Sequence, residues 1–407
     1  MGTISLPPAT MNGMRKVIIK RRVCLGFISS TRLDSFMKSD DWGLLKNLVK
    51  KANYLFIEDR LNYMRFGNIV SPPFSSVERA LKIALQSEEL GFHSIVFPDH
   101  TLMVPPGLTP NALALMSAVA VKTQRILLGT GVTDFARYHP SVIAQFFATI
   151  SHLAPSRVFL GIGAGEAMNI KPFGISWKKF KMLKEGIEIT KKLWSGETFS
   201  YEGEAFRLKD AFLQITPQQP IPIYLGANGR KTRELAGMLC DGWMPILETP
   251  KTYRENLKDV ARGAEKANRS LKEIDTALQI YTAIDENGDE AMKRAKQYAG
   301  AVVSAIEKVE QAGYALEIPE DFPKKFYFEN LLLNDESLAK FAECSLKVNE
   351  EIISDFFIVG SVEEAISKIE EFERAGVRHL MIINIGPDPK FVNRVYAERI
   401  IPSFSEK

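Results

Sequence analysis

The run Ile126-Leu127-Leu128-Gly129-Thr130-Gly131-Val132-Thr133 is apolar at consecutive positions and ends in small and polar residues. Consecutive rather than alternating apolar residues are typical of strands buried on both faces, as in a parallel sheet. Residues 380–383 have the same character. Eight strand candidates follow Met64, namely residues 65–71, 94–99, 126–133, 158–165, 221–226, 242–246, 276–284 and 379–385.

The segments between these candidates have helical periodicity. Val77, Leu81, Ala84 and Leu85 share one helix face, and residues 180–194 place apolar side chains three and four positions apart. Strands that alternate with helices in this way predict an α/β fold, a TIM (β/α) eight-stranded barrel with about a hundred residues beyond the usual ~250. An open doubly wound sheet is the competing fold. It is disfavoured because no G-x-G-x-x-G motif follows the first strand candidate.

The same pattern divides the chain into two parts. Residues 64–407 form the barrel, and the helix-rich interval of about 286–355 is an insertion before the last βα unit. Residues 1–63 form an N-terminal extension in which six basic residues precede the first acidic one, Asp34. We interpret it as a solvated extension rather than a targeting peptide.

Composition excludes several classes of protein. The net charge is only +3, which gives no electrostatic reason to expect binding to nucleic acid or to a membrane surface. No apolar run approaches the roughly 20 residues that span a bilayer. Cys24, Cys240 and Cys344 are far apart, so neither a disulfide framework nor a zinc site is expected. A reducing compartment, the cytoplasm, is the predicted location.

The active site of a TIM barrel forms where the strands end, so we examined the residues after each candidate. The second is followed by Pro98-Asp99-His100. A histidine accepts a proton near neutral pH, and we expect His100 to act as a base that Asp99 orients. An ordinary exposed loop histidine is the alternative interpretation.

Glycine-rich turns follow three further strand candidates. Gly129 and Gly131 predict either close approach of a planar ligand or a kink that curves the barrel. The fourth candidate continues into residues 161–169, where Glu166 and Asn169 add an acid and an amide to alternating glycines. After the fifth, Gly226-Ala227-Asn228-Gly229-Arg230 precedes a helix, an arrangement that favours an anion site.

Further segments complete a recognisable combination: Arg137-Tyr138-His139-Pro140, Ala144-Gln145, Arg157-Val158-Phe159-Leu160-Gly161 and Gly163-Ala164-Gly165-Glu166-Ala167-Met168-Asn169. The combination resembles the luciferase-like monooxygenase superfamily. Within it, the chain is most similar to the deazaflavin-dependent branch that holds secondary alcohol dehydrogenase, glucose-6-phosphate dehydrogenase and methylenetetrahydromethanopterin reductase. The resemblance covers roughly residues 64–407 and is most specific over residues 99–169.

The resemblance implies a bacterial luciferase-like TIM barrel, usually a homodimer, that binds coenzyme F-420 at the strand ends. No metal site is expected from the residues. The resemblance places a non-proline cis peptide bond between Gly131 and Val132, behind the deazaflavin ring. His100 matches the proposed base of the family and Glu166 its acidic partner. The implied cofactor-binding residues are Asp99, Gly131, Val132, Thr133, Gly165 and Asn169 near the ring, and Gly226, Ala227 and Gly229 near the phosphate tail.

The implied reaction is hydride transfer between the deazaflavin and a small organic substrate, an alcohol or a methylene-tetrahydropterin. The sugar and alcohol enzymes carry a Trp where this chain has Val104, and the sugar-phosphate enzyme has an Arg where this chain has Asp355. Glucose 6-phosphate is therefore not the expected substrate. The alternatives are an FMN-dependent monooxygenase that uses reduced flavin and oxygen, and a non-catalytic flavin-binding barrel.

Overall fold

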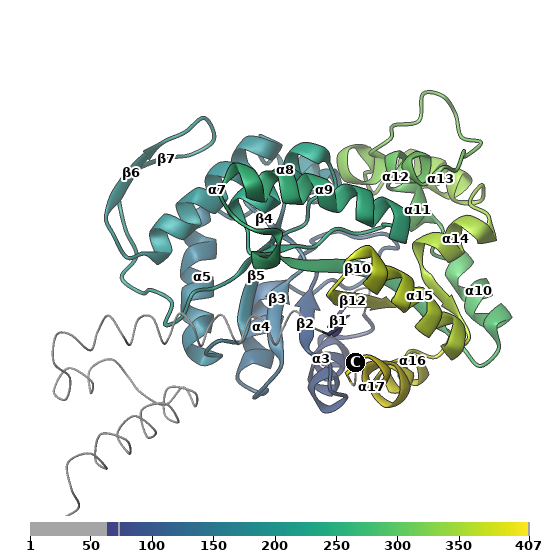
Figure 1. The fold of residues 1–407 in the computed structure, drawn as a ribbon. Coiled ribbons are helices and arrows are strands. Elements are labelled where there is room, and N and C mark those ends of the chain that lie inside the picture. The colour runs from purple at the N-terminus through teal and green to yellow at the C-terminus, as the bar shows by residue number, and fades with distance from the viewer. Residues whose placement is uncertain (1–62, 72–73, 406–407) are drawn as a thin grey trace, which may run out of the picture. The chain divides into compact units, whose positions relative to one another are not determined.

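Eight parallel strands pair in chain order and close into a barrel (Figure 1). The strands are β1 (Arg65–Ile69), β2 (Ser94–Phe97), β3 (Leu127–Thr130), β5 (Val158–Gly163), β8 (Ile223–Leu225), β9 (Gly242–Trp243), β10 (Asp275–Ile284) and β12 (His379–Asn384). The first and last of them pair with each other, with Arg65 opposite His379, and this pairing closes the sheet. The predicted TIM barrel is confirmed, and each of the eight strand candidates overlaps one of these strands.

The computed structural model describes residues 63–71 and 74–405. From Met64 onward the chain is one compact unit. The predicted N-terminal extension, apart from Tyr63, lies outside the described residues. None of the described helices is both long enough and apolar enough to cross a bilayer.

Two apolar layers hold the barrel together. Val96 of β2 belongs to the cluster inside the barrel, whereas its neighbours Ile95 and Phe97 belong to the cluster between the strands and the outer helices. All three side chains are at most 1% exposed, because successive side chains of a strand point to opposite faces and both faces are covered. The continuous apolar runs in the sequence follow from this arrangement.

Helices surround the strands (Figure 1). Ser76 caps the first of them by accepting the backbone N–H of Arg79, and Ser361 and Glu364 form a capping box on a later one. These helices are α3 (Val77–Glu89), α4 (Ala112–Ala120), α5 (Pro140–Leu153), α7 (Lys179–Trp194), α8 (Arg230–Leu239), α9 (Pro250–Lys266), α15 (Val362–Ala375), α16 (Pro389–Val395) and α17 (Ile401–Ser405). Short helical segments are α6 (Ala167–Ile170), η2 (Lys171–Phe173), η3 (Leu271–Glu273) and η5 (Tyr396–Ile400).

The helical insertion is also confirmed, and it extends the apolar cluster of the barrel interior. It consists of α10 (Gly288–Lys296), α11 (Gly300–Val303), α12 (Ile306–Ala312), the π-helical segment η4 (Phe326–Asn330), α13 (Asp335–Ser345) and α14 (Glu350–Phe356). These segments lie together on one side of the molecule (Figure 1). The short strand β11 (Ile358–Gly360) follows them and adds to the end of β10.

Two local features differ from the simple pattern of alternating strands and helices. The third strand candidate is interrupted after Thr130 and resumes as β4 (Thr133–Asp134), which pairs with β5. An antiparallel hairpin of β6 (Phe199–Glu202) and β7 (Arg207–Ala211), which the sequence did not predict, follows α7. Its strands are mostly exposed, so they lack the continuous apolar run by which the barrel strands were recognised.

Candidate active site

The C-terminal ends of the strands open into a cavity of about 530 Å³. The sequence-predicted residues that line it are Asp99, His100, Gly131, Val132, Thr133, Gly165, Glu166, Asn169, Gly226 and Gly229. Ala227 does not line it: this residue is fully buried, and its carbonyl accepts a hydrogen bond from Nε1 of Trp243. The barrel thus brings together side chains that lie as far as 130 residues apart, because all parallel strands end on the same face.

Glu166 and Asn169 hold the imidazole of His100. The His100 Nδ1 atom lies 3.2 Å from Oε2 of Glu166, and Nδ2 of Asn169 donates to the same carboxylate oxygen over 3.2 Å. The Asn169 Oδ1 atom accepts the backbone N–H groups of Thr101 and Leu102, which fixes the orientation of the amide. The Nδ2 atom of Asn169 also lies 3.2 Å from Nδ1 of His100, but it already donates to Glu166. Because Nδ1 faces the carboxylate, which can only accept, we assign the imidazole proton to Nδ1, and Nε2 is then the basic nitrogen.

The electrostatic environment favours protonation of His100. Burial lowers the pKa of the imidazole, but the Glu166 carboxylate, through its charge and its hydrogen bond, raises it by more, so the net shift is above the ordinary value. The side chains of His100 and Glu166 are 16% and 20% exposed, and both border the cavity. The pair has the geometry of a base and the carboxylate that orients it.

The expectation that Asp99 orients His100 is wrong. Oδ2 of Asp99 accepts hydrogen bonds from Oγ1 of Thr133 at 2.7 Å and from Nη2 of Arg137 at 3.0 Å. The side chain of Asp99 is 2% exposed, and both donors bond the same carboxylate oxygen, so Asp99 is engaged with Thr133 and Arg137. Adjacency in sequence misled the prediction, because Glu166 reaches the imidazole from the next strand but one around the barrel.

Arg137 is a site residue whose role the sequence analysis did not identify. Its guanidinium bonds Asp99 and donates from Nε to Oδ2 of Asp134 at 2.6 Å, so two carboxylates share one buried cation. Burial lowers the pKa of Arg137, but Asp134 and Asp99 raise it by more. The motif Arg137-Tyr138-His139-Pro140 marked this arginine in the sequence. Its role became clear only from the positions of Asp99 and Asp134 in the structure.

Val132 forms an apolar bulge on the cavity wall. The peptide bond from Gly131 to Val132 is cis, as the resemblance implies. A Cβ atom on Gly163 would lie 2.5 Å from Cγ2 of Val132, and one on Gly226 would lie 3.0 Å from its Cγ1 atom. The glycines at the ends of β5 and β8 therefore make room for this side chain, and the result is a wall without polar side chains on which a planar ring can lie.

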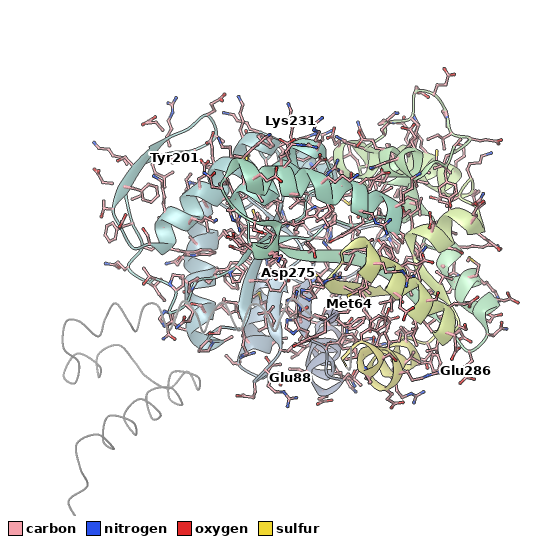
Figure 2. The ribbon with its side chains drawn as sticks, in the orientation of Figure 1. Met64, Glu88, Tyr201, Lys231, Asp275 and Glu286 are labelled. Carbon is pink, nitrogen blue, oxygen red and sulfur yellow. The ribbon has the colours of Figure 1, made fainter. Side chains whose placement is uncertain are left out.

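Lys231, labelled in Figure 2, also lines the cavity and belongs to the first turn of α8. The N-cap residue of this helix, Gly229, has no side chain, and its own N–H donates to Oγ1 of Thr232 at 3.3 Å. Of the cationic side chains that line the cavity in the described part of the chain, Arg137, Lys179, Arg230 and Lys325 form ion pairs and Lys231 does not. A helix N-terminus whose N-cap residue has no side chain, beside a cation without an ion pair, is suited to an anionic group.

A buried ion pair supports the loop that precedes α8. Lys308, from α12 of the insertion, lies 2.8 Å from Oε1 of Glu248 and donates to Oδ1 of Asn228 at 2.8 Å. The two side chains are 6% and 0% exposed, and burial lowers the pKa of Lys308 despite the opposing effect of Glu248. The insertion therefore fixes the Asn228 side chain, and the sequence pattern gave no sign of this contact.

Two tyrosines complete the lining. Tyr281 comes from β10 and Tyr327 from η4 of the insertion. Burial, and then the charge of Glu166, raise the pKa of both phenols well above the ordinary value. The alternation of inward and outward side chains along β10 could have identified Tyr281, whereas Tyr327 lies in an irregular region with no periodic signal. In the described residues, no group of three or more His, Cys, Asp or Glu side chains is placed to hold a metal ion.

Comparison with known proteins extends these observations. A coenzyme F-420-dependent glucose-6-phosphate dehydrogenase of Microbacterium testaceum is 31% identical over 353 residues, which cover 84% of this chain and 98% of that protein. The solved structure of an F-420-dependent secondary alcohol dehydrogenase with an F-420–acetone adduct is 26% identical, with a TM-score of 0.71 over 84% of this chain and 99% of that one.

The F-420-dependent tetrahydromethanopterin reductase of Methanopyrus kandleri shares the fold, with a TM-score of 0.70 at 24% identity over 84% of this chain and all of that one. The family model described as luciferase-like monooxygenase matches residues 64–379, nearly the whole barrel. The predicted resemblance is thereby confirmed, and the chain belongs to the luciferase-like monooxygenase family.

Proposed function

We propose that this protein is a coenzyme F-420-dependent oxidoreductase that transfers a hydride between the deazaflavin and a small organic substrate. The observation that carries the proposal is the pair of His100 and Glu166, 3.2 Å apart on the wall of the cavity. The F-420-dependent relatives, which match over most of the chain, support the choice of cofactor.

The lining of the cavity fits such a cofactor. Val132 would give the ring an apolar backing, and Asp99 and Arg137 would offer it polar groups. Lys231 and the start of α8, which line the cavity together with Gly226 and Gly229, would hold a phosphate-bearing tail. Of the implied cofactor residues, Ala227 can contribute only backbone, since its side chain is buried.

In the proposed mechanism, the bound deazaflavin supplies the hydride chemistry at its carbon 5. Nε2 of His100 takes the hydroxyl proton of an alcohol as the hydride leaves the substrate carbon. Glu166 accepts the Nδ1 proton in a hydrogen bond and stabilises the resulting imidazolium. Asn169 holds the carboxylate in place for this task.

The substrate class we propose is an alcohol or its ketone, with a methylene-tetrahydropterin as the second candidate. An alcohol is favoured because a base and its carboxylate are present, whereas an iminium-like pterin needs no base. Asp355, where the resemblance places an Arg in the sugar-phosphate enzyme, pairs with Lys368 at 3.0 Å and does not line the cavity. That position provides no cation for a sugar phosphate.

The test is a fluorescence titration of the purified protein with F-420 and, separately, with FMN. Tight binding of F-420 alone is the expected result. Preference for FMN, with oxygen uptake in the presence of reduced FMN, would instead make the protein a monooxygenase. Binding of neither cofactor would overturn the proposal.

We further propose that the protein is a homodimer in the cytoplasm. The resemblance to the deazaflavin-dependent branch supports the homodimer, and the two described cysteines, Cys240 and Cys344, are both free thiols, as in a reducing compartment. Light scattering coupled to size exclusion tests the oligomeric state, with a mass of twice 45.7 kDa expected.

A further inference from the structure

The hydroxyl groups of the described tyrosines divide into two sets. Seven of these tyrosines make hydrogen bonds through Oη: Tyr138 with Asn111, Tyr201 with Glu188, Tyr224 with Asp275, Tyr253 with the Ala277 carbonyl, Tyr298 with Arg294, Tyr314 with Asp355 and Tyr396 with Thr282. Tyr63 is 42% exposed and can bond water. Tyr281 and Tyr327 are only partly exposed, and neither has a hydrogen-bond partner in the described residues.

This difference coincides with the cavity, which both unpartnered tyrosines line. Neither phenol oxygen is among the buried side-chain atoms that lack a partner in the described residues, so both hydroxyl groups face the space of the cavity. A hydroxyl group that is not committed to a protein partner is free to bond a molecule that enters this space.

The rings of these tyrosines are held in place although their hydroxyl groups are not. Tyr281 stacks on Phe357, with ring centroids 4.8 Å apart and planes at 29°. Tyr327 packs against Phe328 and Phe341, at 5.4 and 6.3 Å. Fixed rings present their hydroxyl groups in defined positions, which a merely space-filling residue does not require.

The location of the pair indicates the substrate rather than the cofactor. The implied ring-contacting residues lie at the ends of β2, β3 and β5, whereas β10 is four strands away from β3 around the barrel and so lies across from it. Both phenols line the same cavity as His100 and Glu166, and the charge of Glu166 contributes to the raised pKa of both phenols. A substrate that meets the base therefore lies in a cavity that the two phenols border.

We propose that Tyr281 and Tyr327 are specificity-determining residues that donate hydrogen bonds to a second, uncharged oxygen of the substrate, close to the carbon that reacts. The assignment to the substrate side rests on the proposed function. The expected substrate is thus a hydroxy-ketone or the corresponding diol rather than a simple ketone or alcohol. An anionic group is disfavoured at this point because Glu166 is already there and the nearby Lys179 is paired with Glu329.

The experiment measures the binding of acetone and hydroxyacetone, two ketones that differ by one hydroxyl group. Binding is followed by fluorescence of F-420 in the loaded protein, and by tryptophan fluorescence in the protein without F-420, since Trp177 lines the cavity. The variants are Tyr281→Phe and Tyr327→Phe, which remove only the hydroxyl group. Tyr298→Phe is the matched control, because Tyr298 does not line the cavity and bonds Arg294.

The wild-type protein and Tyr298→Phe are expected to bind hydroxyacetone more tightly than acetone. In Tyr281→Phe and Tyr327→Phe this preference should fall roughly 3- to 10-fold, the value of one neutral hydrogen bond, while affinity for acetone and F-420 stays unchanged. No preference in the wild type, or full preference in both variants, would overturn the proposal. Weaker F-420 binding in the variants would also overturn it, by assigning the phenols to the cofactor.

Failure of the proposed function gives a different result. If the wild type does not bind F-420 but still prefers hydroxyacetone in a manner that depends on the two hydroxyl groups, the cofactor assignment is wrong and the phenol site stands. If F-420 binds and the preference is absent, the cofactor assignment stands and the phenol site is wrong.

Discussion

The two ring nitrogens of His100 have different roles: Nδ1 orients the imidazole, and Nε2 is the proposed base. The Nδ1 atom is engaged with Glu166, and Nε2 has no hydrogen bond in the described residues, so a reacting hydroxyl group can approach it. His100 and Glu166 were both candidates in the sequence, and the structure shows that Glu166 faces the Nδ1 atom of His100. The sequence could not reveal that Asn169 links the two, because this contact depends on the direction in which α6 follows β5.

Replacement of His100 by Ala tests its role as base. We expect turnover to fall roughly 10²- to 10⁴-fold, the contribution typical of a general base, with the dissociation constant for F-420 unchanged. Steady-state kinetics and cofactor titration measure the two quantities. The control is His152→Ala, since His152 is exposed and bonds the Thr216 carbonyl away from the cavity. Equal turnover in His100→Ala and the wild type would remove His100 from the mechanism.

The Glu166→Gln variant tests the electrostatic role of the carboxylate. Glu166 raises the pKa of His100, and the base must be neutral to accept a proton, so alcohol oxidation declines as pH falls through that raised pKa. Without the negative charge the pKa is lower, and the acidic limb of the kcat/KM profile should move to lower pH. The exposed Glu286, outside the cavity, provides the control Glu286→Gln (Figure 2). An unmoved limb in Glu166→Gln would contradict the proposed pairing.

The strands β3 and β5 are held together by hydrogen bonds of one side chain, Thr130. Oγ1 of Thr130 donates to the Gly161 carbonyl at 2.7 Å and accepts the Gly161 N–H at 3.1 Å. A Cβ atom on Gly161 would lie 1.7 Å from the Thr130 carbonyl oxygen. The glycine at this position is therefore required by the close approach of two backbones.

Gly161→Ala should consequently destabilise the barrel. Relief of the clash must move backbone atoms, and we expect the free energy of unfolding to fall by about 1 to 3 kcal/mol, as for other overpacked interiors. Chemical denaturation monitored by circular dichroism measures the change. Gly229→Ala is the matched control, because its added methyl group would meet nothing closer than Oγ1 of Thr232, at 3.8 Å. Equal stability of the two variants would show that β3 and β5 tolerate separation.

Helix faces were predicted less well than strands. Val77 is 47% exposed, and the buried side chains of α3 are Ala80, Ala84 and Ser87. Small residues carry a weak apolar signal in a sequence, yet they are the ones that let a helix lie close to a strand: Oγ of Ser87 accepts a hydrogen bond from Asn68 of β1. The periodicity of apolar residues predicted the helix correctly. Its buried face is the one with small side chains, because only these allow the helix to lie close to the strands.

For the molecule as a whole, closure of the barrel is reinforced by a buried ionic network at the N-terminal ends of the strands. Asp275, labelled in Figure 2, lies 2.5 Å from Nη2 of Arg65 and 3.3 Å from Nδ1 of His379. Its carboxylate also accepts the hydroxyl group of Tyr224 at 2.5 Å. These residues belong to β10, β1, β12 and β8, so the network joins the first and last strands of the barrel.

Asp275→Asn should therefore destabilise the protein strongly. The change leaves Arg65, whose side chain is 5% exposed, without its counter-charge, and about 3 to 5 kcal/mol is expected for a broken buried pair. Burial raises the pKa of Asp275, but Arg65 and His379 hold it well below the ordinary value. A depressed pKa stabilises the fold above the unfolded-state pKa of about 3.9, and this stabilisation is lost as pH falls below it.

Unfolding measured at several pH values checks both statements. The wild type should lose stability at acidic pH more steeply than Asp275→Asn, which has no carboxyl group to titrate there. The exposed Asp321, whose side chain is 80% exposed, supplies Asp321→Asn as the control with little effect. A variant Asp275→Asn as stable as the wild type at neutral pH would show that the network does not hold the barrel closed.

The sequence by itself determined the order of strands, the closed α/β architecture and most of the candidate residues that line the cavity. Apolar runs such as residues 126–133 are buried on both faces only in a parallel sheet that is covered on both sides. In a barrel of parallel strands, all C-terminal strand ends lie on the same face. His100 and Glu166 could be selected on that basis alone. The type of residue that follows a strand can be read directly from the sequence, without knowledge of the tertiary structure.

Only the tertiary structure decided which side chains act together. Asp99 pairs with Arg137 rather than His100, Lys308 reaches Asn228 from the insertion, and Tyr281 and Tyr327 join the cavity lining from distant segments. Contacts of this kind depend on strand register, loop path and the packing of the insertion. None of these is a periodic property of the sequence, so they become visible only when the barrel has closed.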